Sequence, residues 1–513
     1  MKRRDFLKYA SSVASTSVVP VGLSMNLLAQ RAYAASPVYS NVSVTAPAVL
    51  PQVINIFMYG GASELAGNLS NIEQINMHSQ NDYTANNAFT SNILLNATDN
   101  DPANRSRFND GQITANKFWK EAGGTYMEDM LAANQMTVYR TLYKQKSPTR
   151  SHRESIFMSH KGTLDIENSP GIGSRLALML KQHESTYQNV PTADGSALGA
   201  LDEVVLPFVS FEGESQTYAL DPDNPLPLTL RGLTMDSSFN NPYTRGSIGG
   251  SDSAIEALLA ARKTEMDASE SKYFKAADGF TKRADLESRM QNLSSLLNGT
   301  DANSNQSSAE ALGVTYPNSN FARQLEAAVT LAIHNPQTLY MAMGTSGLGG
   351  WDDHNNGIDR YPNRMNDVMA AIKAGMAHIE ASNGVTTING GTRTRTDNIV
   401  INVFGDFGRL VNLNGSGGWD HANNQNLYTF GGAGVRPTKE AAALGSVIGT
   451  TERAGSSKTN NQYTIPTSGS PTWEPMSVAS SIYGYFGATN SHILTADATY
   501  NPDGDVRFED KLP

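Results

Sequence analysis

The sequence contains no cysteine among its 513 residues. This absence excludes disulfide bonds, thiolate metal ligands and a cysteine nucleophile. Any metal site must therefore be built from imidazole nitrogens and oxygen ligands. We expect no nucleotide or flavin cofactor.

Basic residues are also scarce: 39 Lys and Arg stand against 49 Asp and Glu, which gives a formal net charge of −10. Removing the first 34 residues, which carry five basic residues and one acidic residue, makes this charge −14. No basic cluster interrupts the remainder. Because an acidic surface is repelled by phosphates, we expect neither nucleic acid nor an anionic membrane as a partner.

Long hydrophobic runs are missing as well, even near the N-terminus. Residues 9–28 are only weakly apolar, since serines and Pro20 interrupt them. They follow Arg3-Arg4-Asp5-Phe6-Leu7-Lys8 and precede the small-residue pattern Ala32-Tyr33-Ala34, an arrangement typical of a twin-arginine export signal. The alternative is a membrane anchor, for which the stretch is too polar. We expect export by the twin-arginine translocase, cleavage after about residue 34, no stable membrane span afterwards, and a periplasmic or extracellular location.

The sequence after the leader alternates between strand and helix patterns. Short apolar runs predict strands at 53–58, 136–142, 204–211, 337–343, 398–404 and 426–430. Helical spacing of apolar residues predicts helices at 321–334, 360–381 and 474–486, and a further helix is expected to begin near 147–152. This alternation predicts an α/β fold with a doubly wound, mostly parallel sheet. We interpret 35–513 as one domain with a polar loop insertion at about 66–118. A helical insertion at about 252–313 would be a cap over the site or a partner-binding surface.

Acidic residues and histidines follow two of the predicted strands. Asp352 and His354 come after the strand at 337–343, while Asp406, Asp420 and His421 come after the strand at 398–404. Ligands of open α/β sheets bind at the carboxyl ends of the strands, and mixed carboxylate and imidazole sets suit divalent cations. We therefore predict a metal centre. The alternative is that these are polar loop residues that cap helices.

Two further groups could take part in chemistry. Ser151 stands where a helix is expected to begin, so it is a candidate nucleophile assisted by Arg150, His152 and the positive helix end; the alternative is an ordinary N-cap. Arg409 either pairs with Asp406 or clamps an anionic substrate. His334 and His378 belong to no such group, and the sequence assigns them no role.

Several motifs together resemble one family. They are a strand ending in Gly60-Gly61-Ala62, Thr149-Arg150-Ser151-His152, Phe321-Ala322-Arg323-Gln324-Leu325, Gly350-Trp351-Asp352-Asp353-His354, Phe404-Gly405-Asp406-Phe407-Gly408-Arg409 and Gly415-Ser416-Gly417-Gly418-Trp419-Asp420-His421. In this order, from about 53 to 434, they resemble the domain of unknown function 1501 family. That family comprises secreted bacterial proteins grouped with the alkaline phosphatase and sulfatase superfamily. The resemblance implies a sheet of alkaline phosphatase/sulfatase-like type and one or two divalent ions (zinc, manganese, magnesium or calcium). It also implies a nucleophile at a helix start.

Carried over by position, the resemblance implies metal ligands at Asp352, His354, Asp406, Asp420 and His421, with Ser151 as the nucleophile. The chain departs from the family where the first motif usually has an acid, because Ser63 stands there. Glu64 either supplies that ligand or the ligand is lost. The strand-end acid Asp406 is more often Glu in the family, and Ala422 replaces a usual Gly.

Two functions are compatible with these features. The first is an exported metal-dependent hydrolase acting on phosphate or sulfate esters, including a small anionic ester or a phosphorylated or sulfated polymer. The second is a noncatalytic envelope binding or assembly protein that retains the fold. Both Asp-His pairs favour the first, and the missing acid at Ser63 favours the second.

Overall fold

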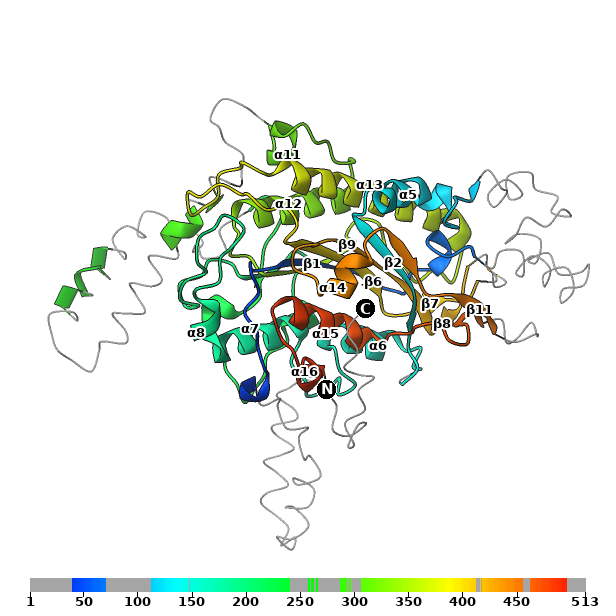
Figure 1. Cartoon of the computed structure of the whole chain (residues 1–513), viewed down its shortest axis with the longest axis horizontal. Helices are drawn as coiled ribbons and strands as arrows, with labels where there is room; N and C mark the ends of the chain where they lie inside the picture. Colours follow the sequence, from blue (N-terminus) through cyan, green and yellow to red (C-terminus); the bar gives the residue numbers. More distant parts are fainter. Residues whose placement is uncertain are drawn as a thin grey trace, which may run out of the picture.

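The structure, a computed structural model, describes residues 39–70, 112–146, 148–239, 306–411, 416, 418–454 and 462–495, with some positions between 257 and 297. Its centre is an eight-stranded sheet in the order β10-β2-β9-β6-β1-β5-β3-β4 (Figure 1). Within it, β9 runs antiparallel to β2 and β6, and the other neighbours are parallel. The strands are β1 (Gln52–Met58), β2 (Met136–Tyr143), β3 (Phe208–Ser210), β4 (Leu233–Thr234), β5 (Tyr340–Gly344), β6 (Ile399–Gly405), β9 (Asn424–Gly431) and β10 (Ser446–Ile448).

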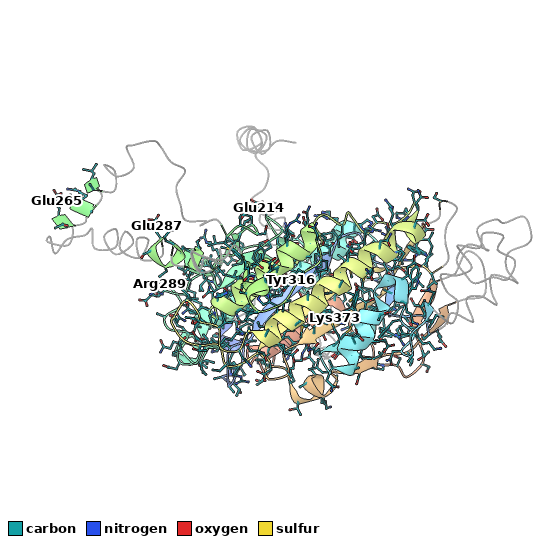
Figure 2. The ribbon with its side chains drawn as sticks, turned by 90° about the horizontal axis from the view of Figure 1, so that it is seen from above. Glu214, Glu265, Glu287, Arg289, Tyr316 and Lys373 are labelled. Atoms are coloured by element: carbon teal, nitrogen blue, oxygen red, sulfur yellow. The ribbon has the colours of Figure 1, made fainter. Side chains whose placement is uncertain are left out.

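Helices cover both faces of this sheet (Figure 1). One face carries α5 (Gly124–Ala132), α12 (Asn320–His334) and α13 (Gly357–Ala381), and the other carries α6 (His152–Lys161), α7 (Ile172–Gln182) and α15 (Pro475–Tyr485). Successive residues of β1 point to opposite faces, so Ile54 and Ile56 join one apolar core while Val53 and Phe57 join the other. Figure 2 shows α12 and α13 side by side from above, with Lys373 of α13 beside α5. The predicted mixed α/β fold with a mostly parallel central sheet is confirmed.

The strands β1 and β6 lie at the centre and are buried on both faces. All seven residues of each strand are buried. Such mostly apolar, fully buried strands are typical of parallel strands covered by helices on both sides. Their carboxyl ends consequently open at the same edge of the sheet, where the following loops meet.

Shorter elements decorate the sheet. An antiparallel ladder of β7 with β8 lies next to the carboxyl end of β6, and β11 pairs with β12. The short elements are η1 (Tyr39–Asn41), η2 (Glu64–Ala66), η4 (Lys120–Ala122), η5 (Gln216–Tyr218), η6 (Leu228–Leu230), β7 (Gly408–Arg409), β8 (His421–Ala422), β11 (Thr451–Ala454), β12 (Gln462–Pro466), α8 (Glu184–Tyr187), α11 (Ser308–Ala311), α14 (Thr438–Ala442) and α16 (His492–Thr495).

The predicted elements agree with the structure to different degrees. The helix expected at 321–334 is α12, whose start is capped by the Ser319 hydroxyl accepting the Ala322 N–H at 3.1 Å. The strand expected at 204–211 is shorter, since β3 spans three residues. The leader 1–34 lies outside the described residues, as do most of the insertions at 66–118 and 252–313. Among the helices of the described ranges, none combines the length and apolarity needed to cross a bilayer.

Candidate metal centre

Five chain segments meet at the carboxyl edge of the sheet. The loops after β1, β5 and β6 converge there with the start of α6 and with β8. The segments are residues 60–61, 351–354, 406–409, 151–152 and 420–421. The site is thus assembled from parts of the chain that are far apart in the sequence.

Three imidazoles and one carboxylate face a common point in this site. The Nε2 atoms of His152, His354 and His421 lie 3.4, 3.2 and 3.6 Å from Asp352 Oδ1. The ligand atoms of His152, Asp352 and His421 all lie within 4.8 Å of one another, and His354 Nε2 lies 2.8 Å from His421 Nε2. Ligands around a tetrahedral zinc ion with bonds of 2.0–2.1 Å are separated by about 3.3 Å. His152, Asp352 and His421 are therefore close enough to share one ion, and His354 lies beside Asp352 and His421.

The remaining nitrogen of each imidazole is held by an oxygen. His152 Nδ1 lies 2.6 Å from Asp406 Oδ2, and His354 Nδ1 lies 3.2 Å from Asp420 Oδ1. Because ionised carboxylates only accept, both Nδ1 atoms carry the hydrogen. This leaves the Nε2 lone pairs directed at the common point, which is the usual support for a histidine that binds a metal.

His421 is oriented in the same way by the main chain. Its Nδ1 donates to the carbonyl oxygen of Arg150 at 2.8 Å. This bond also ties the loop before α6 to β8. A carbonyl can only accept, so the Nε2 atom of neutral His421 has no hydrogen.

These tautomers test whether the residues suit a cation. With hydrogens on both Nδ1 atoms, the unprotonated Nε2 atoms of His354 and His421 lie 2.8 Å apart, with Arg409 Nη1 3.4 Å from that of His354. Two lone pairs at this distance repel each other unless a cation or a proton lies between them. His152 Nε2 is buried and has no hydrogen-bond partner among the described residues. Three nitrogen ligands with one oxygen suit zinc and related ions better than calcium or magnesium, which prefer oxygen. The residues fit a divalent metal ion.

Arg409 fastens the loops around this point. It is fully buried, and Nε donates to Gly61 O at 2.8 Å while Nη1 donates to Trp419 O at 2.9 Å. Nη2 donates to Asp352 Oδ1 at 2.6 Å and to the carbonyl of Gly60. Each nitrogen of the guanidinium is thus committed to a protein acceptor. The structure pairs Arg409 with Asp352, whereas the sequence suggested Asp406.

The charges at the site keep the carboxylate ionised. Burial would raise the pKa of the Asp352 carboxyl, but the hydrogen bond and charge of Arg409 hold it below its usual value. The hydrogen bond that His152 donates to Asp406 raises the pKa of His152. Burial, with the charge of Arg409, lowers the pKa of His421.

Two tryptophans support the loops that carry the ligands. Trp351 precedes Asp352 and its indole N–H donates to Thr345 at 2.7 Å. Trp419 precedes Asp420 and its N–H donates to Val411 O at 3.0 Å. Both rings are fully buried and pack against the ring of Tyr361, with centroid-to-centroid distances of 5.9 and 5.7 Å. The two loops therefore share one rigid aromatic support.

The paired glycines of the first motif are required by close packing. Gly60 has a φ of +113°, and a Cβ atom there would lie 2.4 Å from the backbone nitrogen of Asp352. Its own N–H donates to Asp406 Oδ1 at 3.0 Å. The turn after β1 consequently positions both Asp352 and the acid that orients His152.

The other predicted site residues lie around the centre in different ways. Ser151 is the N-cap of α6, where its hydroxyl accepts the Glu154 N–H at 3.5 Å, and Arg150 contributes its carbonyl. Glu64 is fully buried in η2 beside Gly408 and belongs to no metal-ligand group of the described residues. Asp406 and Asp420 contact imidazole nitrogens.

Two residues that support the site were not identified from the sequence. Asp353 is buried and forms ion pairs with Arg360, at 3.2 Å, and Arg364, which anchor the loop after β5. Lys144 is buried behind the start of α6, where Nζ donates to Thr149 O at 2.6 Å. Burial lowers its pKa to about 8. Two features of the sequence could have indicated them. Asp353 is the second acid of an Asp-Asp pair, and Lys144 directly follows an apolar strand.

Fold and site together define an α/β protein with a histidine-rich candidate metal centre at the carboxyl edge of its sheet. The chain belongs to the family described as "Protein of unknown function (DUF1501)", whose model matches residues 51–467. All predicted site residues lie in this range. No curated protein matches the chain.

Proposed function

We propose that the chain is a metal-dependent hydrolase of phosphate or sulfate esters, with an alkaline phosphatase/sulfatase-like arrangement of sheet and site. The observation that carries this proposal is the convergence of His152, His354 and His421 on Asp352 Oδ1, at 3.2–3.6 Å. The fixed tautomers support it, since each Nδ1 is occupied by an oxygen acceptor.

The four converging residues would hold the ion, with zinc as our preferred ion because of the three imidazoles. A bound divalent ion would polarise an ester oxygen and lower the pKa of a bound water or hydroxyl. Asp406 and Asp420 keep two of the imidazoles in the binding tautomer. Arg409 keeps Asp352 in place and ionised.

The start of α6 would bind the anionic group of the substrate. Its free backbone N–H groups and positive helix end favour anions. Arg150 is exposed there, unlike Arg409, whose nitrogens are already occupied. Ser151, adjacent to His152, is our proposed nucleophile, because its capping bond of 3.5 Å is long and costs little to break.

A noncatalytic envelope binding or assembly protein is the second candidate. The capping role of Ser151 favours it, because that hydroxyl is already used by the helix. Metal binding without turnover would be the mark of such a protein.

Turnover of chromogenic esters tests the proposal. The full-length chain, loaded in turn with zinc, manganese, magnesium and calcium, is assayed with aryl phosphates and aryl sulfates before and after chelation. We expect metal-dependent turnover that His152→Ala abolishes and the control His183→Ala retains. His183 is at the end of α7 and contacts Tyr39 O. Absence of turnover in every loaded form would favour the noncatalytic protein.

We also propose export through the twin-arginine pathway, from the paired arginines Arg3 and Arg4. Cell fractionation tests this. We expect the native chain outside the cytoplasm, and the Arg3→Lys/Arg4→Lys double variant retained inside it. Equal distribution of the two chains would contradict the proposal.

A further inference from the structure

A second polar cluster lies on the face of the sheet opposite α6, around Ser308 of α11. The Ser308 hydroxyl lies 3.0 Å from His334 Nε2 of α12 and 3.4 Å from His378 Nε2 of α13. Both imidazoles are buried, whereas Ser308 is partly exposed. A partly exposed serine is therefore backed by two histidines.

Hydrogen bonds define which groups donate in this cluster. His334 Nδ1 lies 3.3 Å from the carbonyl oxygen of Thr386, which can only accept, so Nδ1 carries the hydrogen and Nε2 accepts the Ser308 hydroxyl. The Tyr316 hydroxyl lies 3.3 Å from His378 Nδ1. If Tyr316 donates there, His378 Nε2 donates to Ser308, and all four side chains form one directed chain ending at Thr386.

Both imidazoles are neutral in this environment, so each has one ring nitrogen without a hydrogen. Burial lowers the pKa of His334, with a contribution from Arg393. Burial lowers the pKa of His378 to about 3. The arrangement of serine, neutral histidine and an oxygen that orients the histidine is that of an activated nucleophile.

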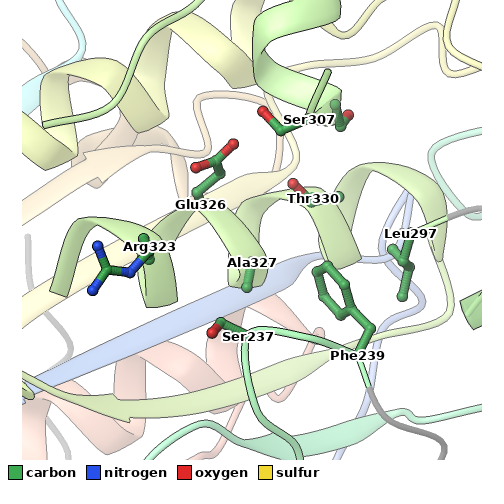
Figure 3. Close-up of a pocket in the computed structure, with 9 residues that line it drawn as sticks. Ser237, Phe239, Leu297, Ser307, Arg323, Glu326, Ala327 and Thr330 are labelled. Atoms are coloured by element: carbon green, nitrogen blue, oxygen red, sulfur yellow. The ribbon is translucent and has the colours of Figure 1, made fainter. Parts of the chain in front are cut away.

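Ser308 also lines a pocket of about 250 Å³. At roughly 30 Å³ per water this is space for about eight waters, and hence for a small organic molecule. Figure 3 shows Thr330 between Ser307 and Phe239, with Leu297 to one side. Along α12, His334 lies one turn beyond Thr330 of the pocket lining.

We infer that Ser308 and His334 form a second, metal-independent nucleophilic site that accepts small carboxylic esters from this pocket. Ser308 Oγ attacks the ester carbonyl carbon while its proton passes to His334 Nε2. The bond to the alkoxy oxygen then breaks, and His334 returns the proton to the departing alcohol. Water attacks the acyl-serine by the reverse proton path, which releases the acid and restores Ser308.

The two sites are independent of each other. The pocket shares no residue with the metal centre, and α11, α12 and α13 lie across the sheet from α6. Failure of one proposal therefore leaves the other standing, provided that the experiment separates metal-dependent from metal-independent reactivity.

Labelling with a fluorophosphonate tests this site. In the expected reaction Ser308 Oγ bonds to phosphorus, fluoride leaves and His334 takes the proton. The full-length chain is labelled with and without chelator, and the modified peptide is located by mass spectrometry. We expect one label at Ser308 at a rate that chelation and His152→Ala leave unchanged. The rate at which short-chain p-nitrophenyl esters are hydrolysed should also be unchanged by chelation.

Variants separate a reactive serine from a structural one. Ser308→Ala should abolish labelling and ester hydrolysis, and His334→Gln should slow labelling by about 10²-fold, the usual contribution of a general base. Ser237→Ala, which lines the same pocket without a histidine contact, is the matched control and should react at the native rate. No label on the native chain, a label at another residue, or equal rates in His334→Gln would show that the cluster only joins α11 to α12 and α13.

Discussion

His152 Nδ1 and Asp406 Oδ2 lie 2.6 Å apart although 254 residues separate them in the chain. The contact joins the start of α6 to the end of β6. It fixes the ring so that Nε2 points at Asp352. Asp406 is fully buried and accepts the Gly60 N–H as well, so its two oxygens hold two different segments in register.

Asp406→Asn tests this support. The amide can still accept from Gly60, but it holds the His152 tautomer less firmly, so we expect the affinity for the metal to fall by about 10–100-fold. Titration of the chelator-treated chain with Co²⁺ measures it. Asp367→Asn on α13 is the control and should bind as the native chain does. Unchanged affinity in Asp406→Asn would contradict the orienting role.

The sequence predicted the location of the site but not the role of each residue. Strand ends and Gly-rich loops were sufficient to place Asp352, His354 and His421 at one edge, since parallel strands open together. The role of His152 was not apparent, because its ring orientation depends on an acid 254 residues away. Likewise, Asp406 and Asp420 contact imidazoles through side-chain directions that spacing does not specify.

The fold was predictable where burial alone determines the element. β1 and β6 are mostly apolar and buried on both faces, and they were identified within about two residues. β3 was overestimated, because the apolar residues 204–207 before it are buried in a loop and look like strand in the sequence. α7 was not predicted; it is buried along most of its length, including Ser174 and Arg175.

Glu64 is either a metal ligand or a buried neutral acid, and the Glu64→Gln variant separates these two roles. Burial raises the pKa of its carboxyl well above the usual range. A raised folded-state pKa stabilises the fold fully below the unfolded pKa, and this stability is lost as pH rises through the folded pKa. Glu64→Gln should therefore remove that loss and be more stable than the native chain at neutral pH. Urea unfolding across pH, with chelator present, measures this.

The same variant tests the sequence-based expectation that Glu64 binds the metal. We expect Glu64→Gln to retain native metal content. Loss of the metal would show that Glu64 reaches the ion.

Arg436 and Glu440 form a fully buried ion pair, with Nη1 and Oε1 3.0 Å apart, on which the Tyr485 hydroxyl also converges. Glu440→Ala leaves the guanidinium buried without its partner, so we expect a loss of about 3–5 kcal/mol in the free energy of unfolding. The Arg436→Met/Glu440→Leu double variant should show a smaller loss in the free energy of unfolding, because it leaves no buried charge unpaired. Denaturant unfolding compares them.

The exposed pair of Arg153 with Glu167 provides the control for that comparison. Arg153→Ala should change stability by less than about 1 kcal/mol, as is usual for ion pairs at the surface. A loss in Glu440→Ala no larger than in Arg153→Ala would contradict the importance of the buried pair.

Arg409→Lys tests the fastening of the loops. A lysine has one nitrogen and cannot serve the carbonyls of Gly61 and Trp419 together with Asp352. We expect a loss of roughly 2 kcal/mol or more in unfolding free energy, together with weaker metal binding. Native behaviour in both measurements would contradict the fastening role.

Metal content with Co²⁺ spectroscopy tests the central claim most directly. We predict about one divalent ion per chain at this site and, after replacement by Co²⁺, the strong visible absorption typical of a four-coordinate site with nitrogen and oxygen ligands. His152→Ala and His421→Ala should each abolish this spectrum while His183→Ala retains it. A native chain that binds no ion, or binding that survives both ligand substitutions, would contradict the account.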